Sequence, residues 1–334
     1  MLKFNEEKQV ADIKGALGLR PKVEKIIDEI WDKGFDAIYY LGIGGTYASA
    51  LQAESYIKGK SNLPVYVQHA AEYYTTGNQR LTKDSLVILS SVTGTTQEVV
   101  QAVDEMKKIG ATLFGFIDKA NSPLAEKCDY VVTYPNPGTE QIKFFMAADR
   151  LMQKNGEFSD YDAYYAELEE HLPQGLVNAE KQADAFGLVF AEKHRHDPMH
   201  YFIATGNQWG ACYSYAMCYW EEQSWLPSKS ITAAEFLHGT LEIVEEKTAV
   251  TLFLGEDEQR PLAERVKNLL PRICGNYSLI DTKDYPVPGI SEKYRGRILS
   301  FLLMHAVTQR IDAHVEQLNC HPLDIRRYYR QFDY

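Results

Sequence analysis

Apolar residues in the first part of the chain follow two patterns, short continuous runs and longer amphipathic stretches. The continuous runs are typical of buried parallel strands. They lie at residues 37–42, 64–68, 85–90, 111–117 and 130–133. The amphipathic stretches have helical spacing, and they lie at residues 22–33, 48–56 and 96–109. Because strands alternate with helices, the pattern predicts an α/β fold with a parallel sheet.

The same order of elements returns in the second half of the chain. The apolar run that ends at Gly206 repeats the strand-to-glycine step at Gly44, and the run that ends at Gly255 repeats the strand before Thr93. Both pairs are 162 positions apart. Two matches at one spacing predict a duplicated α/β domain. Residues 141–195 contain no strand pattern, which favours a connecting helical hairpin.

These patterns divide the chain of 334 residues into three parts. Residues 1–35 form an N-terminal helical segment, residues 36–180 a first α/β domain with connecting helices, and residues 181–334 a second domain with a C-terminal tail. The length is sufficient for two domains with ordinary cores.

Composition and charge exclude several classes of protein. The net charge is −11 and no Lys/Arg run occurs, so we expect no nucleic-acid partner. No apolar run approaches the roughly 20 residues of a membrane span, and the N-terminus has no signal-peptide pattern. Five scattered cysteines without a Cys-x-x-Cys pair favour reduced thiols and a cytoplasmic location.

Two strand-to-helix turns are rich in hydroxyls and glycines. Ser91-Val-Thr-Gly-Thr-Thr96 follows a buried strand, and Gly42-Ile-Gly-Gly-Thr46 follows another. A helix N-terminus attracts anions because amide N–H groups and the helix dipole point at the ligand. In a parallel sheet the two turns could face each other at the carboxyl edge, where ligands bind. The alternatives are a plain helix N-cap and a tight connection. The candidate phosphate-binding residues are Thr46, Ser91, Thr93 and Thr96, and Gly45 and Gly94 are further substrate-binding candidates.

A carboxylate and an imidazole sixteen positions apart, Glu222 and His238, are the candidate acid–base pair. Sugar-phosphate isomerisation needs one group to carry a proton between adjacent carbons and another to open a ring or protonate a heteroatom. If Glu222 is buried, desolvation should bring its pKa near neutrality. The alternatives are that Glu222 is a carboxylate on a helix surface and that His238 is a histidine whose hydrogen bonds are made within a turn. Glu235 either orients the substrate-binding site or caps a helix.

A histidine-rich segment, His194-Arg-His196 with Asp197 and His200, is the one cluster of metal-ligand types that the sequence offers. We interpret these residues as part of a solvated linker. The His-Glu-x-x-His and Gly-x-Ser-x-Gly motifs are absent, and the glycine-rich turn departs from the dinucleotide pattern at Tyr47. We therefore expect no metal site and no cofactor.

Four segments together resemble the sugar isomerase (SIS) domain family. They are Gly44-Gly-Thr-Tyr47, Ser91-Val-Thr-Gly-Thr-Thr96, Asn121-Ser-Pro-Leu-Ala125 and Glu235-Phe-Leu-His-Gly239. The spacing of Glu222 and His238 is similar to that in the isomerase half of glucosamine-6-phosphate synthase. The resemblance covers most of residues 36–334. It implies two tandem flavodoxin-like SIS domains, each a parallel sheet flanked by helices, in a homodimer or larger assembly with active sites near subunit boundaries.

A closer resemblance is to the fructosamine-6-phosphate deglycases. The segment from Glu256 to Arg265 and the ending from His321 to Tyr334 carry it. It implies an enzyme that cleaves a 6-phosphorylated Amadori compound into glucose 6-phosphate and an amine or amino acid. Glu222 would then carry the proton, and His238 would open the ring or protonate the leaving nitrogen, without a metal or redox cofactor.

Two alternatives share the same residues. An aldose–ketose phosphosugar isomerase or an amino-sugar-phosphate deaminase would differ only in the pocket for the amine. A non-catalytic sugar-phosphate sensor belongs to a different class. Such regulators often carry a DNA-binding helix-turn-helix or lack the Glu/His pair, whereas this chain has the pair and a short acidic N-terminus.

Overall fold

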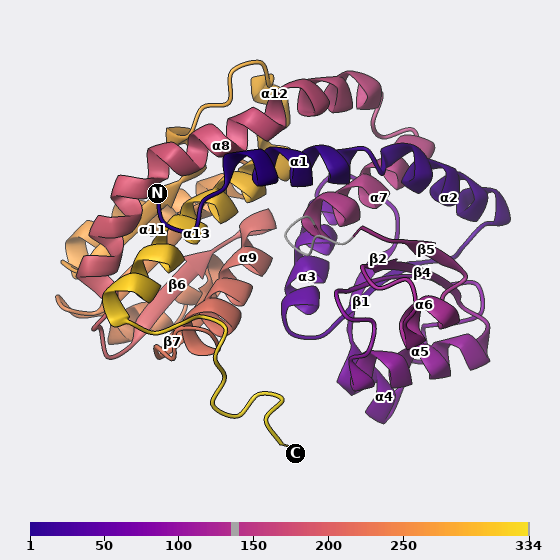
Figure 1. Ribbon diagram of the computed structural model, residues 1–334, viewed down its shortest axis with the longest axis horizontal. Helices are drawn as coiled ribbons and strands as arrows, with labels where there is room; N and C mark the ends of the chain where they lie inside the picture. Colours follow the sequence, from indigo (N-terminus) through magenta and orange to yellow (C-terminus); the bar gives the residue numbers. More distant parts are fainter. Residues whose placement is uncertain (135–139, 333–334) are drawn as a thin grey trace. The chain divides into compact units, whose positions relative to one another are not determined.

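Two parallel sheets organise the chain, one in each of two folding units (Figure 1). The computed structural model describes residues 1–134 and 140–332. One unit is Glu7–Glu170, and the other joins Met1–Glu6 to His171–Tyr334. Asp333 and Tyr334, which close the deglycase-like ending, lie outside the described residues.

The sheet of the Glu7–Glu170 unit has five strands in the order β2-β1-β3-β4-β5, and every pair is parallel. The strands are β1 (Ile38–Gly42), β2 (Val65–His69), β3 (Leu86–Ser91), β4 (Thr112–Ile117) and β5 (Tyr130–Val132). Every residue of β1 and β3 is buried, as continuous apolar runs predict. The predicted α/β fold with parallel sheets flanked by helices is confirmed.

Helices cover both faces of this sheet (Figure 1). The helices of this part of the chain are α1 (Glu6–Leu17), α2 (Arg20–Lys33), α3 (Gly45–Lys58), α4 (Ala70–Thr76), α5 (Gln97–Ile109), α6 (Pro123–Lys127) and α7 (Glu140–Lys154), and α2 to α6 contact the strands. Helix α5 shows why the pattern folds this way: Val99, Val103 and Met106 lie on one face and pack against Val87 and Leu113 of the sheet.

The second unit repeats the arrangement with four parallel strands in the order β7-β6-β8-β9. The strands are β6 (His200–Ala204), β7 (Ser228–Thr232), β8 (Ala249–Leu254) and β9 (Tyr277–Asp281). The helices are α8 (Tyr161–His194, begun in the first unit), α9 (Trp209–Ser214), α10 (Ala233–Phe236), α11 (Arg260–Ile273), α12 (Glu292–Tyr294) and α13 (Ser300–Asn319). Short 3₁₀ turns lie at Gly206–Gln208, Thr240–Ile243 and Thr282–Asp284, and π-helical turns at Tyr215–Glu221 and Arg295–Leu299.

The repeat seen in the sequence is a repeat of topology. Strand β6 begins 162 positions after β1. In each sheet the first strand in sequence, β1 or β6, pairs with the second on one side and with the third on the other. Helices α7 and α8 fill the segment predicted as a helical hairpin. The two compact units divide after Glu170, within α8. None of the helices in the described part of the chain has both the length and the apolar character needed to cross a membrane.

Candidate functional site

The switch point of the first sheet lies between β1 and β3. From β1 the chain goes to β2 on one side, and β3 then pairs with β1 on the other side, with Leu41 opposite Leu89. Open parallel sheets bind ligands at the carboxyl ends of the strands at such a point. The two hydroxyl-rich turns follow these two strands directly, so the prediction that they are neighbours at the carboxyl edge is confirmed.

The turn after β1 is built by its glycines and by Thr46. A Cβ on Gly42 would lie 2.5 Å from the carbonyl carbon of Thr46, and Gly44 has φ +59°, so both positions favour glycine. The Thr46 hydroxyl accepts a bond from the Ile43 amide and donates one to the Ile43 carbonyl, both at 3.0 Å. Thr46 therefore shapes the turn. A Cβ on Gly44 or Gly45 would meet no atom within 4 Å, so the start of α3 borders open space.

The turn after β3 is held from inside by Ser91. Its buried hydroxyl accepts a bond from the Gly94 amide at 2.9 Å. Gly94 has φ +67°, and a Cβ there would lie 2.1 Å from the Ser122 hydroxyl. The Leu124 amide donates to the Gly94 carbonyl at 3.2 Å. The segment around Ser122, which contributes to the SIS resemblance, thus fixes the shape of the turn.

Thr93 and Thr96 occupy the outer part of the same turn. The Thr93 hydroxyl accepts bonds from the Thr95 amide at 3.3 Å and the Thr95 hydroxyl at 2.9 Å. Thr96 is the N-cap of α5, and its side chain makes no capping bond there. Because α5 has 13 residues, its N-terminus carries the partial positive charge that attracts anions. The polar groups of this turn at the N-terminus of α5 are backbone amides and the Thr96 hydroxyl.

The equivalent turn in the second unit is filled by the chain itself. Gly206 has φ +61°, close to that of Gly44. The Asp257 carboxylate accepts the Asn207 amide at 2.9 Å and the Gln259 amide at 2.8 Å, and Gln259 Oε1 accepts the Gly206 amide at 3.2 Å. A protein carboxylate and a side-chain amide thus take the place of an external anion, so the first unit is the candidate for phosphate binding. No sequence pattern identified Asp257 in this role.

Glu222 follows the π-helical turn Tyr215–Glu221, and its amide bonds to the Met217 carbonyl at 3.0 Å. Such π-helical turns are frequent at functional sites. The Glu222 side chain is 30% exposed and accepts a bond from Arg326 Nε at 2.8 Å. The burial expected for Glu222 is therefore only partial. At the neighbouring Glu221, partial desolvation raises the pKa of the carboxyl, which accepts the Ser228 hydroxyl at 3.2 Å.

The C-terminal tail clamps the loop that follows Glu222. Besides the Arg326 contact, the Arg327 guanidinium lies 4.3 Å from the centre of the Trp225 ring. His321 Nε2 lies 3.0 Å from the Gln223 carbonyl. Sequence reasoning used the tail only for its family resemblance and missed Arg326, because 104 positions separate it from Glu222 and no local pattern links them.

His238 lies exposed in the turn after α10, and its amide donates to the Glu235 carbonyl at 3.1 Å. Thr232 is the N-cap of α10, and its hydroxyl accepts the Glu235 amide at 3.2 Å. Glu235 thus occupies the third position of a capped helix, where a glutamate is favourable. This geometry favours the capping alternative for Glu235.

Glu222 and His238 lie toward opposite ends of β7. Glu221 contacts Ser228, the first residue of β7, whereas His238 follows its last residue, Thr232, and the short helix α10. Five residues of strand span roughly 16 Å. In the described part of the chain, no side-chain hydrogen bond joins the two residues. One copy of the chain therefore does not bring this acid–base pair together.

The histidine segment departs from the sequence expectation. His196 is exposed, as expected for a solvated linker, but the side chains of His194 and His200 are 0% exposed. For these two residues the solvated-linker interpretation is wrong. His194 is the last residue of α8 and His200 the first of β6, so both belong to elements that pack into the core of the second unit.

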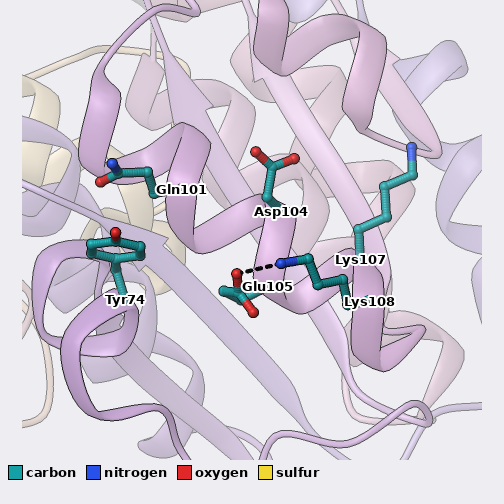
Figure 2. A pocket seen from close by; sticks show the side chains of 6 residues that line it. All are labelled: Tyr74, Gln101, Asp104, Glu105, Lys107 and Lys108. Carbon is teal, nitrogen blue, oxygen red and sulfur yellow. Dashed lines mark hydrogen bonds and ion pairs between the residues drawn. The ribbon is translucent and has the colours of Figure 1, made fainter.

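A surface pocket of about 400 Å³ lies between α4 and α5 (Figure 2). Its lining residues are Tyr74, Gln101, Asp104, Glu105, Lys107 and Lys108. Lys108 Nζ is bonded to Glu105 at 2.6 Å. Lysines and carboxylates neutralise each other here, and the pocket lies on a helical face instead of at the carboxyl edge of the sheet, so it is not the candidate site.

Comparison with known proteins links the geometry to a family. Residues 30–147 match the SIS domain. The chain is 27% identical to fructosamine deglycase FrlB of Bacillus subtilis, over 94% of this chain and 97% of that protein. It is 25% identical to fructoselysine 6-phosphate deglycase of Escherichia coli, over 92% and 90%. A crystal structure of a candidate phosphosugar isomerase from Bacillus subtilis superposes with a TM-score of 0.88 at 26% identity, covering 94% of this chain and 97% of that chain. The resemblance drawn from the sequence is confirmed: residues 30–147 match the SIS domain, and the whole chain is similar to proteins named as fructosamine deglycases.

Proposed function

We propose that the chain is a fructosamine-6-phosphate deglycase. It cleaves a 6-phosphorylated Amadori compound to glucose 6-phosphate and an amine or amino acid. The observation that carries the proposal is similarity across more than nine tenths of the chain to two proteins named as deglycases. The anion-binding turns and the Glu222–His238 spacing supply groups that this chemistry requires.

The phosphate of the substrate binds at the switch point of the first sheet. The amides at the start of α5 and the Thr96 hydroxyl bind its oxygens. Thr46, Ser91 and Thr93 contribute by holding the two turns in shape, which the hydrogen bonds of all three hydroxyls support. Gly45 allows the backbone to approach the ligand closely, and Gly94 adopts the positive φ that shapes the second turn around Ser122.

The reaction is an isomerisation followed by hydrolysis. Glu222 removes a proton from C1 of the open-chain ketoamine, and an enaminol forms. Return of a proton to C2 leaves an imine at C1. Water adds to this imine carbon, the C–N bond breaks, and the amine departs with a proton from the acid. His238 opens the sugar ring or protonates the leaving nitrogen.

At the level of the fold, we propose tandem flavodoxin-like SIS domains at residues 36–180 and 181–334, preceded by the helical segment 1–35. The strand order 2-1-3-4-5 of the first sheet is the flavodoxin-like order, and the second sheet repeats its first four positions. We also propose a cytoplasmic location, because all five cysteines are free thiols.

Product analysis tests the proposed activity. A panel of 6-phosphorylated fructosamines is incubated with the protein, and the products are identified by mass spectrometry. Release of glucose 6-phosphate and free amine supports a deglycase. Aldose–ketose interconversion with the C–N bond intact would instead identify an isomerase, and turnover of no phosphorylated substrate would favour a sensor.

Thr96→Ala should raise KM for the phosphorylated substrate by roughly 10- to 150-fold, because a charge-assisted hydrogen bond contributes about 1.5–3 kcal/mol. Ser91→Ala should act in the same direction, since it releases the Gly94 amide from the turn. Steady-state kinetics measures both effects. Thr75→Ala on α4, whose exposed hydroxyl bonds only to backbone carbonyls of its own helix, is the matched control. Unchanged affinity in the Thr96 and Ser91 variants would remove the turn from the site.

We further propose that the chain is a homodimer or larger assembly, in which Glu222 of one copy and His238 of another serve the same substrate. The separation of the two residues along β7 supports this proposal. Mixing Glu222→Gln and His238→Asn subunits, each inactive alone, should then restore activity, because one site in each mixed dimer keeps both native residues. Mixtures that stay inactive after verified subunit exchange would show that each site draws both residues from one copy.

A further inference from the structure

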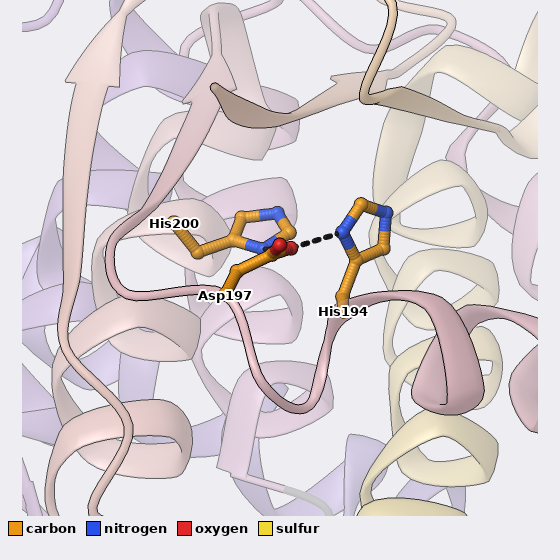
Figure 3. Close-up of side chains that lie close together, drawn as sticks. All are labelled: His194, Asp197 and His200. Carbon is orange, nitrogen blue, oxygen red and sulfur yellow. Dashed lines mark hydrogen bonds and ion pairs between the residues drawn. The ribbon is translucent and has the colours of Figure 1, made fainter. Parts of the chain in front are cut away.

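Three side chains of the second unit converge at the junction of α8 and β6 (Figure 3). His194 ends α8, Asp197 lies in the turn, and His200 begins β6. His194 Nδ1 lies 2.6 Å from Asp197 Oδ2, and His200 Nδ1 lies 3.8 Å from the same oxygen. One potential ligand atom from each residue lies within 4.8 Å of the others. The two rings lie nearly perpendicular, with centres 4.6 Å apart.

The outer atom of each group has its own partner. His194 Nε2 lies 2.8 Å from the Ser278 hydroxyl on β9, and His200 Nε2 lies 2.7 Å from the Thr251 hydroxyl on β8. Asp197 Oδ1 accepts a bond from Asn276 Nδ2 at 3.2 Å. Metal-binding histidines are usually oriented in this way, by a hydrogen bond at the ring nitrogen that does not bind the metal. The outer contacts leave both Nδ1 atoms and Asp197 Oδ2 facing one another.

His200 Nδ1 is the second, independent sign of a ligand. The atom is buried and has no hydrogen-bond partner, and its 3.8 Å separation from Asp197 Oδ2 exceeds hydrogen-bond length. A buried polar atom without a partner is costly, and a missing ion or water is a common explanation. Because the ring is 0% exposed, a partner for this atom must lie inside the cluster.

We propose that His194 Nδ1, His200 Nδ1 and Asp197 Oδ2 bind a divalent transition-metal ion of the Zn²⁺ class. Two imidazoles and a carboxylate suit Zn²⁺, whereas Ca²⁺ and Mg²⁺ prefer oxygen ligands. Bonds of about 2.1 Å in a tetrahedral site place ligand atoms roughly 3.4 Å apart. That separation lies between the observed 2.6 and 3.8 Å, so small side-chain shifts open the site.

The protonation states fit this assignment. Burial lowers the pKa of both His194 and His200, which favours the neutral rings that metal binding requires. Asp197, whose side chain is 15% exposed, gives the ion a route from solvent.

The ion would be structural. It would tie the end of α8 to the start of β6, while the outer partners of its ligands come from β8 and β9. His200 also contacts Trp220, with ring centres 4.9 Å apart, and Trp220 lies in the π-helical turn before Glu222. The inference does not depend on the proposed deglycase activity, since it concerns the stability of the second unit and its metal content.

The experiment uses the full chain without an affinity tag. The protein is stripped with a chelator and dialysed, then titrated with Zn²⁺, and bound metal and Tm are measured. Co²⁺ serves as a spectroscopic probe because a tetrahedral site gives strong visible absorption. We expect one ion per chain and a rise in Tm. Absence of stoichiometric binding by the wild-type chain, with no change in Tm, would overturn the proposal.

Variants separate a metal site from a simple hydrogen-bond network. Asp197→Asn, nearly identical in shape, should abolish the rise in Tm. His200→Phe, which keeps the stacking on Phe202 at 4.3 Å, should do the same. Ser278→Ala should lower the affinity for the metal about 10- to 100-fold, because metal ligands generally depend on such hydrogen-bond partners. His196→Ala removes an exposed histidine of the same segment and should change nothing. Full metal binding by folded Asp197→Asn, or equal loss in His196→Ala, would contradict the assignment.

Discussion

Glu222→Gln should lower kcat by about 10²–10⁴-fold or more, because general base catalysis contributes that factor and glutamine cannot remove the C1 proton. The substitution keeps the size of the side chain and an acceptor for Arg326 Nε, so the fold should be unchanged. Steady-state kinetics with a 6-phosphorylated fructosamine measures the loss, and circular dichroism verifies folding. Glu221→Gln is the matched control, since that carboxyl belongs to the same turn and bonds to Ser228.

His238→Asn should also depress kcat, and the double variant should lose less than the product of the two single losses, because residues of one catalytic unit do not act independently. Deuterium from solvent should appear at C2 of the glucose 6-phosphate formed by the wild-type chain, provided that the carried proton exchanges with solvent. Near wild-type kcat in Glu222→Gln would eliminate the proton-transfer role of Glu222 and the isomerase-type mechanism with it.

The parts of the fold that the sequence predicted are those set by local spacing. The runs at 85–90 and 111–117 became β3 and β4 because continuous apolar residues suit strands buried on both faces. In α5 the apolar residues Val99, Val103 and Met106 recur at helical spacing, and they form its buried face. The neighbouring position of the two hydroxyl-rich turns followed from the order of parallel strands.

The parts that the sequence could not predict depend on contacts between distant residues. Arg326 reaches Glu222 across 104 positions. Asp257 fills the turn at Gly206 across 50 positions from Asn207. The burial of His194 and His200 arises from packing against residues such as Trp220 and Phe190, whereas in sequence they stand among the polar residues of a linker. The spacing of apolar residues describes one helix or strand at a time, so it does not predict contacts between distant residues.

Glu256→Leu should destabilise the chain by about 3–5 kcal/mol, because removing one partner of a buried ion pair leaves the other charge buried and uncompensated. Glu256 receives two bonds from Arg295, from Nε and Nη2, each at 2.8 Å. The side chains are 5% and 6% exposed. Glu256 Oε1 also accepts the Thr282 hydroxyl at 2.8 Å. Urea unfolding followed by fluorescence measures the free energy of unfolding.

Two further variants show whether the buried charge is the cause. Lys108→Met breaks the exposed pair with Glu105 (Figure 2) and should change the free energy of unfolding by less than about 1 kcal/mol, since solvent screens exposed pairs. Adding Arg295→Met to Glu256→Leu removes the stranded cation, and it should restore part of the lost stability. Recovery would be incomplete because the Arg295 guanidinium also donates to the carbonyls of Thr282 and Tyr285. If the double variant is less stable than Glu256→Leu alone, the loss comes from those hydrogen bonds and from packing, and the uncompensated charge is not its main cause.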